Sequence, residues 1–221
     1  MQAIEVSQLL DLSHTLAADL LGSVTYPHEA LPLIGEFISR IGSQLPTEEY
    51  DQVGENIWIA KDAIVAPTAS ITGPCIIDSG AEVRHCAFIR GNALVGKGAV
   101  VGNSTELKNV ILFDKVQVPH YNYVGDSILG YKSHMGAGSI TSNVKSDKSL
   151  VVIKHGDQRL ETKLKKVGAV LGDFVEVGCG SVLNPGTVIG RSSQVYPLSS
   201  VRGVVPANSI YKCAGEVIAK R

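Results

Sequence analysis

From Ile59 onward, an aliphatic residue recurs at every sixth position. Nine consecutive positions keep this spacing: Ile59, Val65, Ile71, Ile77, Val83, Ile89, Val95, Val101 and Leu107. A small residue also recurs every six positions, four residues after each of the first eight aliphatic residues. These small residues are Ala63, Ala69, Cys75, Ala81, Ala87, Ala93, Ala99 and Thr105. The series continues to Met135 with two five-residue steps and resumes from Leu171 to Val201.

This period of six identifies the fold class. Neither an α-helix nor an antiparallel sheet repeats every six residues, whereas a coil made of three short flat faces does. Each hexad then sends one aliphatic side chain inward and turns a corner beside a small residue. The pattern predicts an all-β fold, a parallel β-helix of hexapeptide repeats over residues 59–221, with between six and seven coils stacked about 4.8 Å apart.

The first 45 residues carry a helical pattern instead. Apolar residues at spacings of three and four predict one amphipathic helix over residues 9–20 and a second over residues 31–41, ending at Gly42. We expect this N-terminal helical pair, residues 1–45, to cap an open end of the prism, because exposed strand edges invite pairing with other chains. Residues 46–58 are polar and acidic and are interpreted as a linker.

One segment, residues 141–166, lacks the hexad and is expected to leave the prism as a loop. It is strongly basic, with three acidic residues against seven basic ones: Lys145, Lys148, Lys154, Arg159, Lys163, Lys165 and Lys166. The segment thus has a net charge of +4 in a chain whose net charge is −1. It is either a solvated excursion or an arm that surrounds phosphate groups.

The overall charge and composition exclude several classes of protein. A net charge of −1 gives no global field that would attract nucleic acid or an anionic membrane. The four cysteines contain no Cys-x-x-Cys pair, so neither a zinc ribbon nor a dithiol redox site is expected, and no bound metal is predicted. No apolar run approaches the ~18 residues that span a bilayer, and the N-terminus lacks the positive charge of a signal peptide. We therefore expect a soluble, cytoplasmic protein.

The middle coils carry more polar side chains than a purely structural prism requires. They are Arg90, Glu106, Lys108, His120, Tyr123, Asp126, His134 and Asn143. A parallel β-helix stacks residues of successive coils at one β spacing, so polar groups one coil apart can converge on one groove. These residues are the candidate site.

Three strings in this region carry a specific resemblance. Residues 106–109 read ELKN, residues 120–126 read HYNYVGD, and residues 136–143 read GAGSITSN. In this order they are similar to the acetyltransferase domain of GlmU, the bifunctional enzyme that makes UDP-N-acetylglucosamine, and to related sugar-1-phosphate nucleotidylyltransferases. The resemblance implies a left-handed β-helix, a homotrimer, and transfer of an acetyl group from acetyl-CoA to the amine of a sugar 1-phosphate.

The resemblance also implies a role for each matching residue. His120 would be the general base, since a neutral imidazole with a reference pKa of about 6.5 can take the amine proton near pH 7. The sugar 1-phosphate would be bound by Arg90, Lys108, Tyr123, His134 and Asn143, with His134 standing where the family has Asn. Ala137 would offer its main chain to the thioester of acetyl-CoA, and Cys179 stands where the family has a CoA-contacting Ser.

Other interpretations of the same residues stay open at this point. One alternative is that Arg90 and Lys108 only pair with Glu106 or Asp126 on the prism surface. A non-catalytic trimer that binds a sugar nucleotide or another protein is the main alternative, because His134 and Val144 stand where the resembling family has Asn and Tyr. The nucleotidyltransferase half of that family is also absent, since no Gly-rich G-x-G-T-R-type loop occurs. A zinc enzyme resembling γ-type carbonic anhydrase is a weaker one, because position 125 is Gly where that family has a second His.

Overall fold

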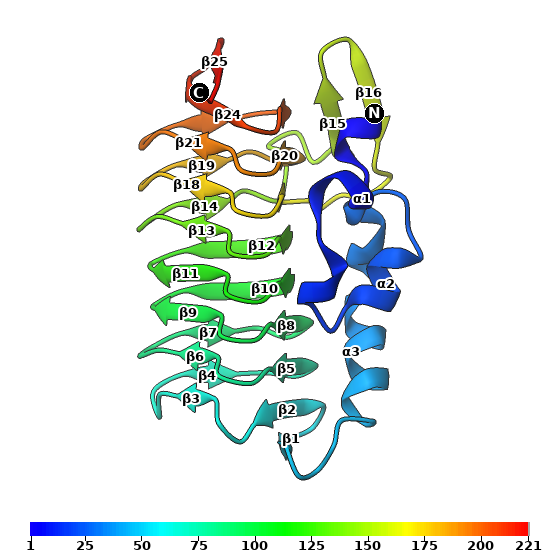
Figure 1. The fold of residues 1–221 in the computed structure, drawn as a ribbon, viewed down its shortest axis with the longest axis vertical. Helices are drawn as coiled ribbons and strands as arrows, with labels where there is room; N and C mark the ends of the chain where they lie inside the picture. Colours follow the sequence, from blue (N-terminus) through cyan, green and yellow to red (C-terminus); the bar gives the residue numbers. More distant parts are fainter. Residues whose placement is uncertain (221) are drawn as a thin grey trace.

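The computed structural model describes residues 1–220 and shows a left-handed parallel β-helix with seven complete turns and the start of an eighth (Figure 1). The fold class is therefore confirmed. Three faces, here A, B and C, alternate along the chain. Face A contains β2 (Ile57–Ala60), β5 (Cys75–Ile77), β8 (Ala93–Val95), β17 (Ala169–Leu171), β20 (Thr187–Ile189), β23 (Val204–Val205) and the second halves of β10 (Glu106–Leu112) and β12 (Tyr123–Leu129).

Face B follows face A in every coil. It contains β3 (Ile64–Val65), β6 (Glu82–Val83), β9 (Val100–Asn103), β11 (Gln117–His120), β13 (His134–Met135), β18 (Glu176–Val177), β21 (Gln194–Val195) and β24 (Ser209–Cys213). Face C contains β4 (Ser70–Ile71), β7 (Phe88–Ile89), the first halves of β10 and β12, β14 (Ile140–Thr141), β19 (Val182–Leu183) and β22 (Ser200–Val201). The two five-residue steps of the sequence fall inside β10 and β12, which pass from face C to face A without a break.

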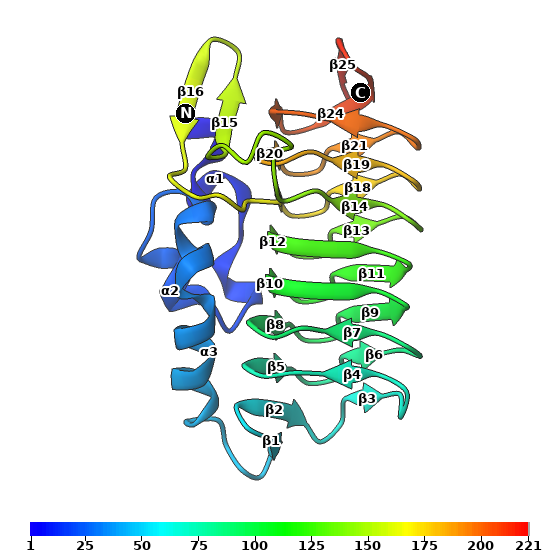
Figure 2. The ribbon, with the colours of Figure 1, turned by 180° about the vertical axis from the view of Figure 1, so that it is seen from behind.

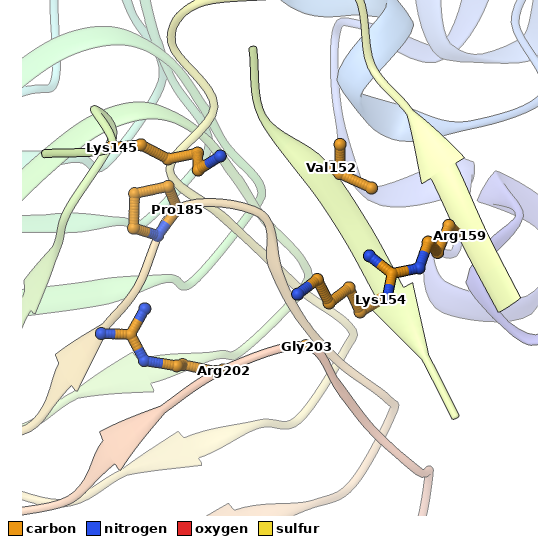
Figure 3. Close-up of a pocket in the computed structure, with 7 residues that line it drawn as sticks. All are labelled: Lys145, Val152, Lys154, Arg159, Pro185, Arg202 and Gly203. Atoms are coloured by element: carbon orange, nitrogen blue, oxygen red, sulfur yellow. The ribbon is translucent and has the colours of Figure 1, made fainter. Parts of the chain in front are cut away.

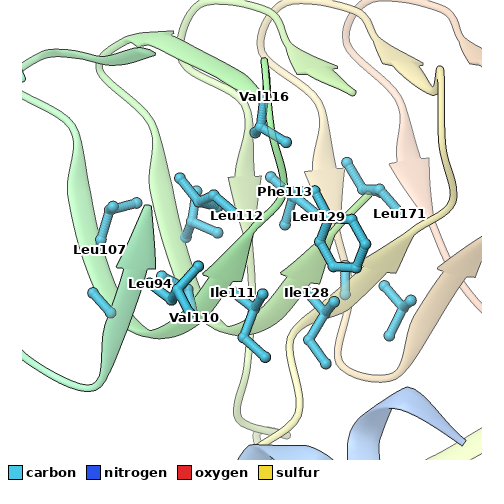
Figure 4. Packing of buried hydrophobic residues seen from close by; sticks show 14 of the residues in the cluster. Leu94, Leu107, Val110, Ile111, Leu112, Phe113, Val116, Ile128, Leu129 and Leu171 are labelled. Carbon is cyan, nitrogen blue, oxygen red and sulfur yellow. The ribbon is translucent and has the colours of Figure 1, made fainter. Parts of the chain in front are cut away.

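The hexad residues fill the interior of the prism. From Ile77 to Leu107 the predicted inward positions are each at most 1% exposed. At the middle coils Leu107, Leu112, Phe113 and Leu129 pack inside the coils (Figure 4). Burial of this kind contributes roughly 25 cal/mol per Å² of apolar surface, so the stacked interior is the main source of stability.

The N-terminal segment lies along face A and does not cap an end of the prism (Figures 1 and 2). It contains η1 (Gln2–Ile4), α1 (Val6–Leu9), η2 (Leu12–His14), α2 (Ala18–Gly22), η3 (Pro27–Leu33) and α3 (Ile34–Gly42). Helix α3 contacts β5, β8 and β10, and η3 contacts β12. The reason is an outward-facing apolar column on face A, at most 6% exposed, made of Trp58, Ile76, Leu94, Ile111, Ile128, Val170 and Val188.

The predicted helix over residues 9–20 is broken, whereas the second ends at Gly42 as expected. Leu10 is extended, and the amide of Asp11 donates to the Asp173 carboxylate over 2.9 Å. The chain therefore leaves the helix to dock on the prism. At Gly42 a Cβ atom would lie 2.3 Å from the ring of Trp58, so only glycine allows this close approach.

An antiparallel hairpin covers one strand edge at each end of the prism. Residues 46–58 are not a linker: β1 (Tyr50–Gly54) pairs antiparallel with β2. At the other end, β25 (Glu216–Ala219) pairs antiparallel with β24. These hairpins occupy strand edges that would otherwise be open to other chains, which is the role expected of the helical pair.

Residues 141–166 leave the prism between β14 and β17 and form a hairpin of β15 (Val152–His155) and β16 (Gln158–Glu161). The hairpin stands beside the last coils, next to the N-terminus (Figure 2). Among residues 1–220, no helix has the length and apolarity needed to cross a membrane.

Candidate functional site

The predicted base and both predicted acetyl-CoA residues lie in one column at the corner between faces B and C. The amide of Gly138 donates to the His120 carbonyl over 3.0 Å, and the amide of Gly180 donates to the Ala137 carbonyl over 2.9 Å. His120, Ala137 and Cys179 therefore follow one another on successive coils, and all three are exposed. We call this set the His120 column. Within the described residues, the His120 imidazole has no hydrogen-bond partner.

A buried asparagine fixes the turn that carries His120. The Asn122 side chain is 2% exposed and accepts from the His120 amide over 3.1 Å. Its amide nitrogen donates to the Gly136 carbonyl over 2.9 Å and to the Ser139 carbonyl over 3.0 Å. Asn122 thus joins the His120 turn to the turn of the next coil, which contains Ala137. The sequence string contained this residue, but its role becomes visible only from the stacking.

A second group of polar residues gathers around Asp126, at the corner between faces C and A. The Asp126 carboxylate is buried and accepts from Lys108 Nζ over 3.0 Å, Asn109 Nδ2 over 3.0 Å and Asn143 Nδ2 over 2.5 Å. Asn143 also donates to the Tyr123 hydroxyl over 3.2 Å. We call these five residues the Asp126 cluster. Burial raises the pKa of Tyr123, so its hydroxyl stays protonated and can donate to a ligand.

Both cations that were predicted to bind the sugar phosphate already form ion pairs. Lys108 pairs with Asp126, and Arg90 pairs with Glu106 over 2.6 Å. The interpretation in which these cations pair on the prism surface is therefore correct for the chain alone. Lys108 is 27% exposed and Asp126 only 5%, so their pair is also the less hydrated of the two. A phosphate at this corner would have to share these cations with the carboxylates.

His134 lies apart from the Asp126 cluster within one chain. It is the outward residue of β13 on face B, and its Nδ1 lies 2.8 Å from Glu176 Oε2. A groove of about 280 Å³ on this face is lined by His134 together with Gly136, Cys179 and Tyr196. Within one chain, His134 therefore lies beside the predicted acetyl-CoA residues and away from the residues predicted to bind the sugar.

No group of three His, Cys, Asp or Glu side chains in residues 1–220 is arranged to hold a metal ion. His85 lies at the same corner of the prism, two coils below His120. Its Nδ1 lies 2.7 Å from the Thr68 hydroxyl and its Nε2 lies 3.2 Å from Cys86 Sγ. The polar neighbours of His85 are therefore Thr68 and Cys86, and neither belongs to the candidate site.

Comparisons with known proteins match the chain to one family of domains. The family described as the GMPPB C-terminal domain matches residues 71–196. A bifunctional GlmU protein of Methanococcus maripaludis strain S2 is 31% identical over 201 residues, covering 90% of this chain and 49% of that protein. A GlmU protein of Trichormus variabilis is 36% identical over 165 residues, covering 71% and 34% respectively. The chain thus spans about half the length, or less, of these curated relatives.

Among solved structures, a putative acetyltransferase of Bacillus cereus has 19% sequence identity and a TM-score of 0.41, and the match covers 73% of this chain and 76% of that one. The family match covers 126 of the 221 residues and includes both the His120 column and the Asp126 cluster. The chain belongs to the GMPPB C-terminal domain family, and its β-helix is of the GlmU acetyltransferase-domain type.

Proposed function

We propose that the protein is an acyltransferase that moves an acetyl group from acetyl-CoA to a sugar phosphate similar to glucosamine 1-phosphate. The observation that carries the proposal is the His120 column: an exposed imidazole that has no hydrogen-bond partner among residues 1–220 and lies directly below Ala137 and Cys179. A neutral imidazole can take the proton of an attacking amine, an effect typically worth 10²–10⁴ in rate. The curated relatives of the chain carry the name of the bifunctional GlmU proteins.

The Asp126 cluster supplies the acceptor side of this proposal. Tyr123 follows His120 by three residues, and its hydroxyl together with the Asn143 amide offers hydrogen bonds to sugar hydroxyls. Lys108 and Arg90 supply positive charge for a phosphate. Because Asp126 already holds Lys108 in place, the cation is positioned before the ligand arrives, which lowers the entropy lost on binding.

The site as a whole is proposed to form between copies of the chain in a homotrimer. In one chain, His134 faces the acetyl-CoA side of the prism and the Asp126 cluster lies at another corner. A second chain placed against the corner between faces B and C can bring these groups to one ligand. This arrangement also leaves face A, which the helices cover, outside the assembly.

The enzymatic proposal is tested by following release of the CoA thiol with a panel of amino and neutral sugar 1-phosphates. His120→Asn is expected to keep ligand affinity within a few fold and to lower kcat by about 10²–10⁴. His85→Asn is the matched control, since His85 is an exposed histidine at the same corner of the prism, two coils below His120. Equal losses in both variants would contradict a role for His120 in proton transfer.

A second candidate function is a non-catalytic module that binds a sugar nucleotide. In this case the Asp126 cluster, in which three side chains donate to one carboxylate, is a preformed polar corner that holds a ligand without reacting with it. The same panel separates the two functions. Sugar-phosphate binding without thiol release, for every acceptor tested, would favour the module.

A further inference from the structure

Two adjoining hollows lie where the β15–β16 hairpin stands against the corner between faces C and A. The first has a volume of about 250 Å³ and is lined by four cationic side chains: Lys145, Lys154, Arg159 and Arg202 (Figure 3). The second has about 260 Å³, shares Lys145 and Arg202, and extends to Ser142. Arg202 belongs to the prism and not to the basic loop, so the structure adds a cation that the sequence pattern did not group with it. We call the first hollow the basic pocket.

Most of this positive charge is not neutralised within the protein. Lys154 and Arg159 are directly opposite each other on the two strands of the hairpin, an arrangement of like charges that is destabilising. Among residues 1–220, neither of them, nor Arg202, forms an ion pair. Lys145 is the exception, because it lies 3.5 Å from Asp147. The four cations and Asp147 therefore leave a local excess of positive charge that an anion would relieve.

The walls of the basic pocket are held in place by close packing. Val151, at the base of the hairpin, is fully buried, and a Cβ atom on Gly186 would lie 2.9 Å from its Cγ1. A Cβ atom on Gly203 would lie 2.8 Å from the Lys154 carbonyl oxygen. Glycine at these two positions lets the hairpin approach the last coils directly. The cations of the hairpin and of the prism thus face each other before any ligand binds.

We propose that the basic pocket binds the diphosphate group of a small molecule. Its volume is below the roughly 300–1,000 Å³ of sites that enclose a whole drug-sized ligand, so it suits a diphosphate and leaves the rest of the ligand outside. Arginine guanidinium groups bind phosphate oxygens in pairs, and lysines add point charge. The second hollow leads from the pocket to Ser142, the neighbour of Asn143 in the Asp126 cluster. A molecule held by its diphosphate can therefore extend toward that cluster.

The proposal is tested on the whole chain by calorimetric titration with inorganic pyrophosphate, and sulfate serves as the reference anion. Pyrophosphate is expected to bind at least 10-fold more tightly than sulfate, and more weakly as salt is added. Arg202→Gln, and the double change Lys154→Gln with Arg159→Gln, are each expected to weaken pyrophosphate binding at least 10-fold. All three side chains are exposed, so these variants are expected to fold, and circular dichroism checks that they do.

Lys97→Gln is the matched control for Arg202→Gln, because Lys97 is exposed, lies on a distant coil and its loss changes the net charge by the same single unit. Pyrophosphate binding no stronger than that of sulfate, or an equal loss in Lys97→Gln, would overturn the proposal. In a second titration, UDP or CoA is added to the protein with pyrophosphate bound, and displacement of the pyrophosphate is measured. Displacement by UDP alone assigns the diphosphate to a nucleotide and displacement by CoA assigns it to CoA, whereas displacement by neither overturns the proposal. Because pyrophosphate takes no part in acyl transfer, this outcome is independent of the His120 test.

Discussion

Asn122 shows how a single buried side chain determines the position of a reactive one. Its amide and carbonyl groups connect two turns of the chain on adjacent coils, and the imidazole of His120 projects from the first of these turns. A buried amide of this kind is costly unless its hydrogen bonds are made. The turn is therefore tied to the next coil, and these hydrogen bonds fix the backbone from which the exposed His120 side chain projects.

At the same scale, His28 predicts how stability depends on pH. The residue is 4% exposed in η3, its Nδ1 has no hydrogen-bond partner among the described residues, and burial lowers the pKa of its imidazole. The folded pKa then lies below the unfolded value, and between the two the unfolded chain binds the extra proton. The free energy of unfolding should therefore fall as the pH drops below about 6.5, by up to about 1.4 kcal/mol per pH unit.

His28→Gln isolates this effect, because glutamine does not titrate. Urea unfolding of parent and variant at pH 7.5 and pH 5.0 gives the difference in their free energies of unfolding at each pH. We expect the parent to lose stability relative to the variant at the lower pH. A difference that stays constant between the two pH values would show that His28 is protonated equally in both states.

At the scale of elements, the spacing of the hexads allowed the prism to be predicted but concealed the helix-binding face. Trp58, Ile76 and Leu94 are 18 residues apart and form a column only once three hexads are known to make one coil. The helices were therefore assigned to an end of the prism, although their apolar side matches face A. The polar residues at 46–58 similarly look like a linker because β1 is exposed over most of its length.

The arrangement of three hexads in each coil also explains which parts of the site could be predicted. His134 and Tyr123 each precede an inward hexad residue, yet the first lies on face B and the second on face C. The face on which each residue lies follows from the number of hexads that precede it in the coil. The five-residue step in β12 makes this number uncertain when only the sequence is known. His120, Ala137 and Cys179 share one phase, each two residues after an inward residue, and the structure places them on successive coils at one corner, while their roles stay predictions. Pairing of Lys108 with Asp126 was one of the alternatives that the sequence left open, and only the stacking of successive coils decides it.

The contact between α3 and face A yields a prediction about stability. Ile38 is fully buried between the helix and the prism, so Ile38→Ala should lower the free energy of unfolding by about 2–5 kcal/mol. Glu36→Ala, on the exposed side of the same helix, should change it by less than about 0.5 kcal/mol. Both values come from chemical denaturation followed by circular dichroism. Similar small losses in the two variants would show that the helical segment contributes little to the stability of the prism.

At the scale of the whole molecule, the three faces of the prism have different surroundings. Helices cover face A, and the N-terminal segment also reaches the later coils through the hydrogen bond of Asp11 to Asp173. Faces B and C remain uncovered in the single chain. Exposed apolar side chains gather at the corner between them, where Tyr121, Tyr196 and Leu198 are 64%, 45% and 85% exposed. This corner also carries the His120 column, so the surface that another copy would bury adjoins the candidate site.

Leu198 provides the test of the proposed homotrimer. An 85% exposed leucine is costly in water and is expected to become buried when three chains of 23.4 kDa assemble into a particle of about 70 kDa. Leu198→Asp should therefore shift the sedimentation equilibrium of the protein toward the monomer, because assembly would then bury an unpaired charge. Val53→Asp is the control, since Val53 is 59% exposed on β1, away from this corner. If the parent itself sediments as a monomer at micromolar concentration, the candidate site must work within one chain, and His134 cannot share a ligand with the Asp126 cluster.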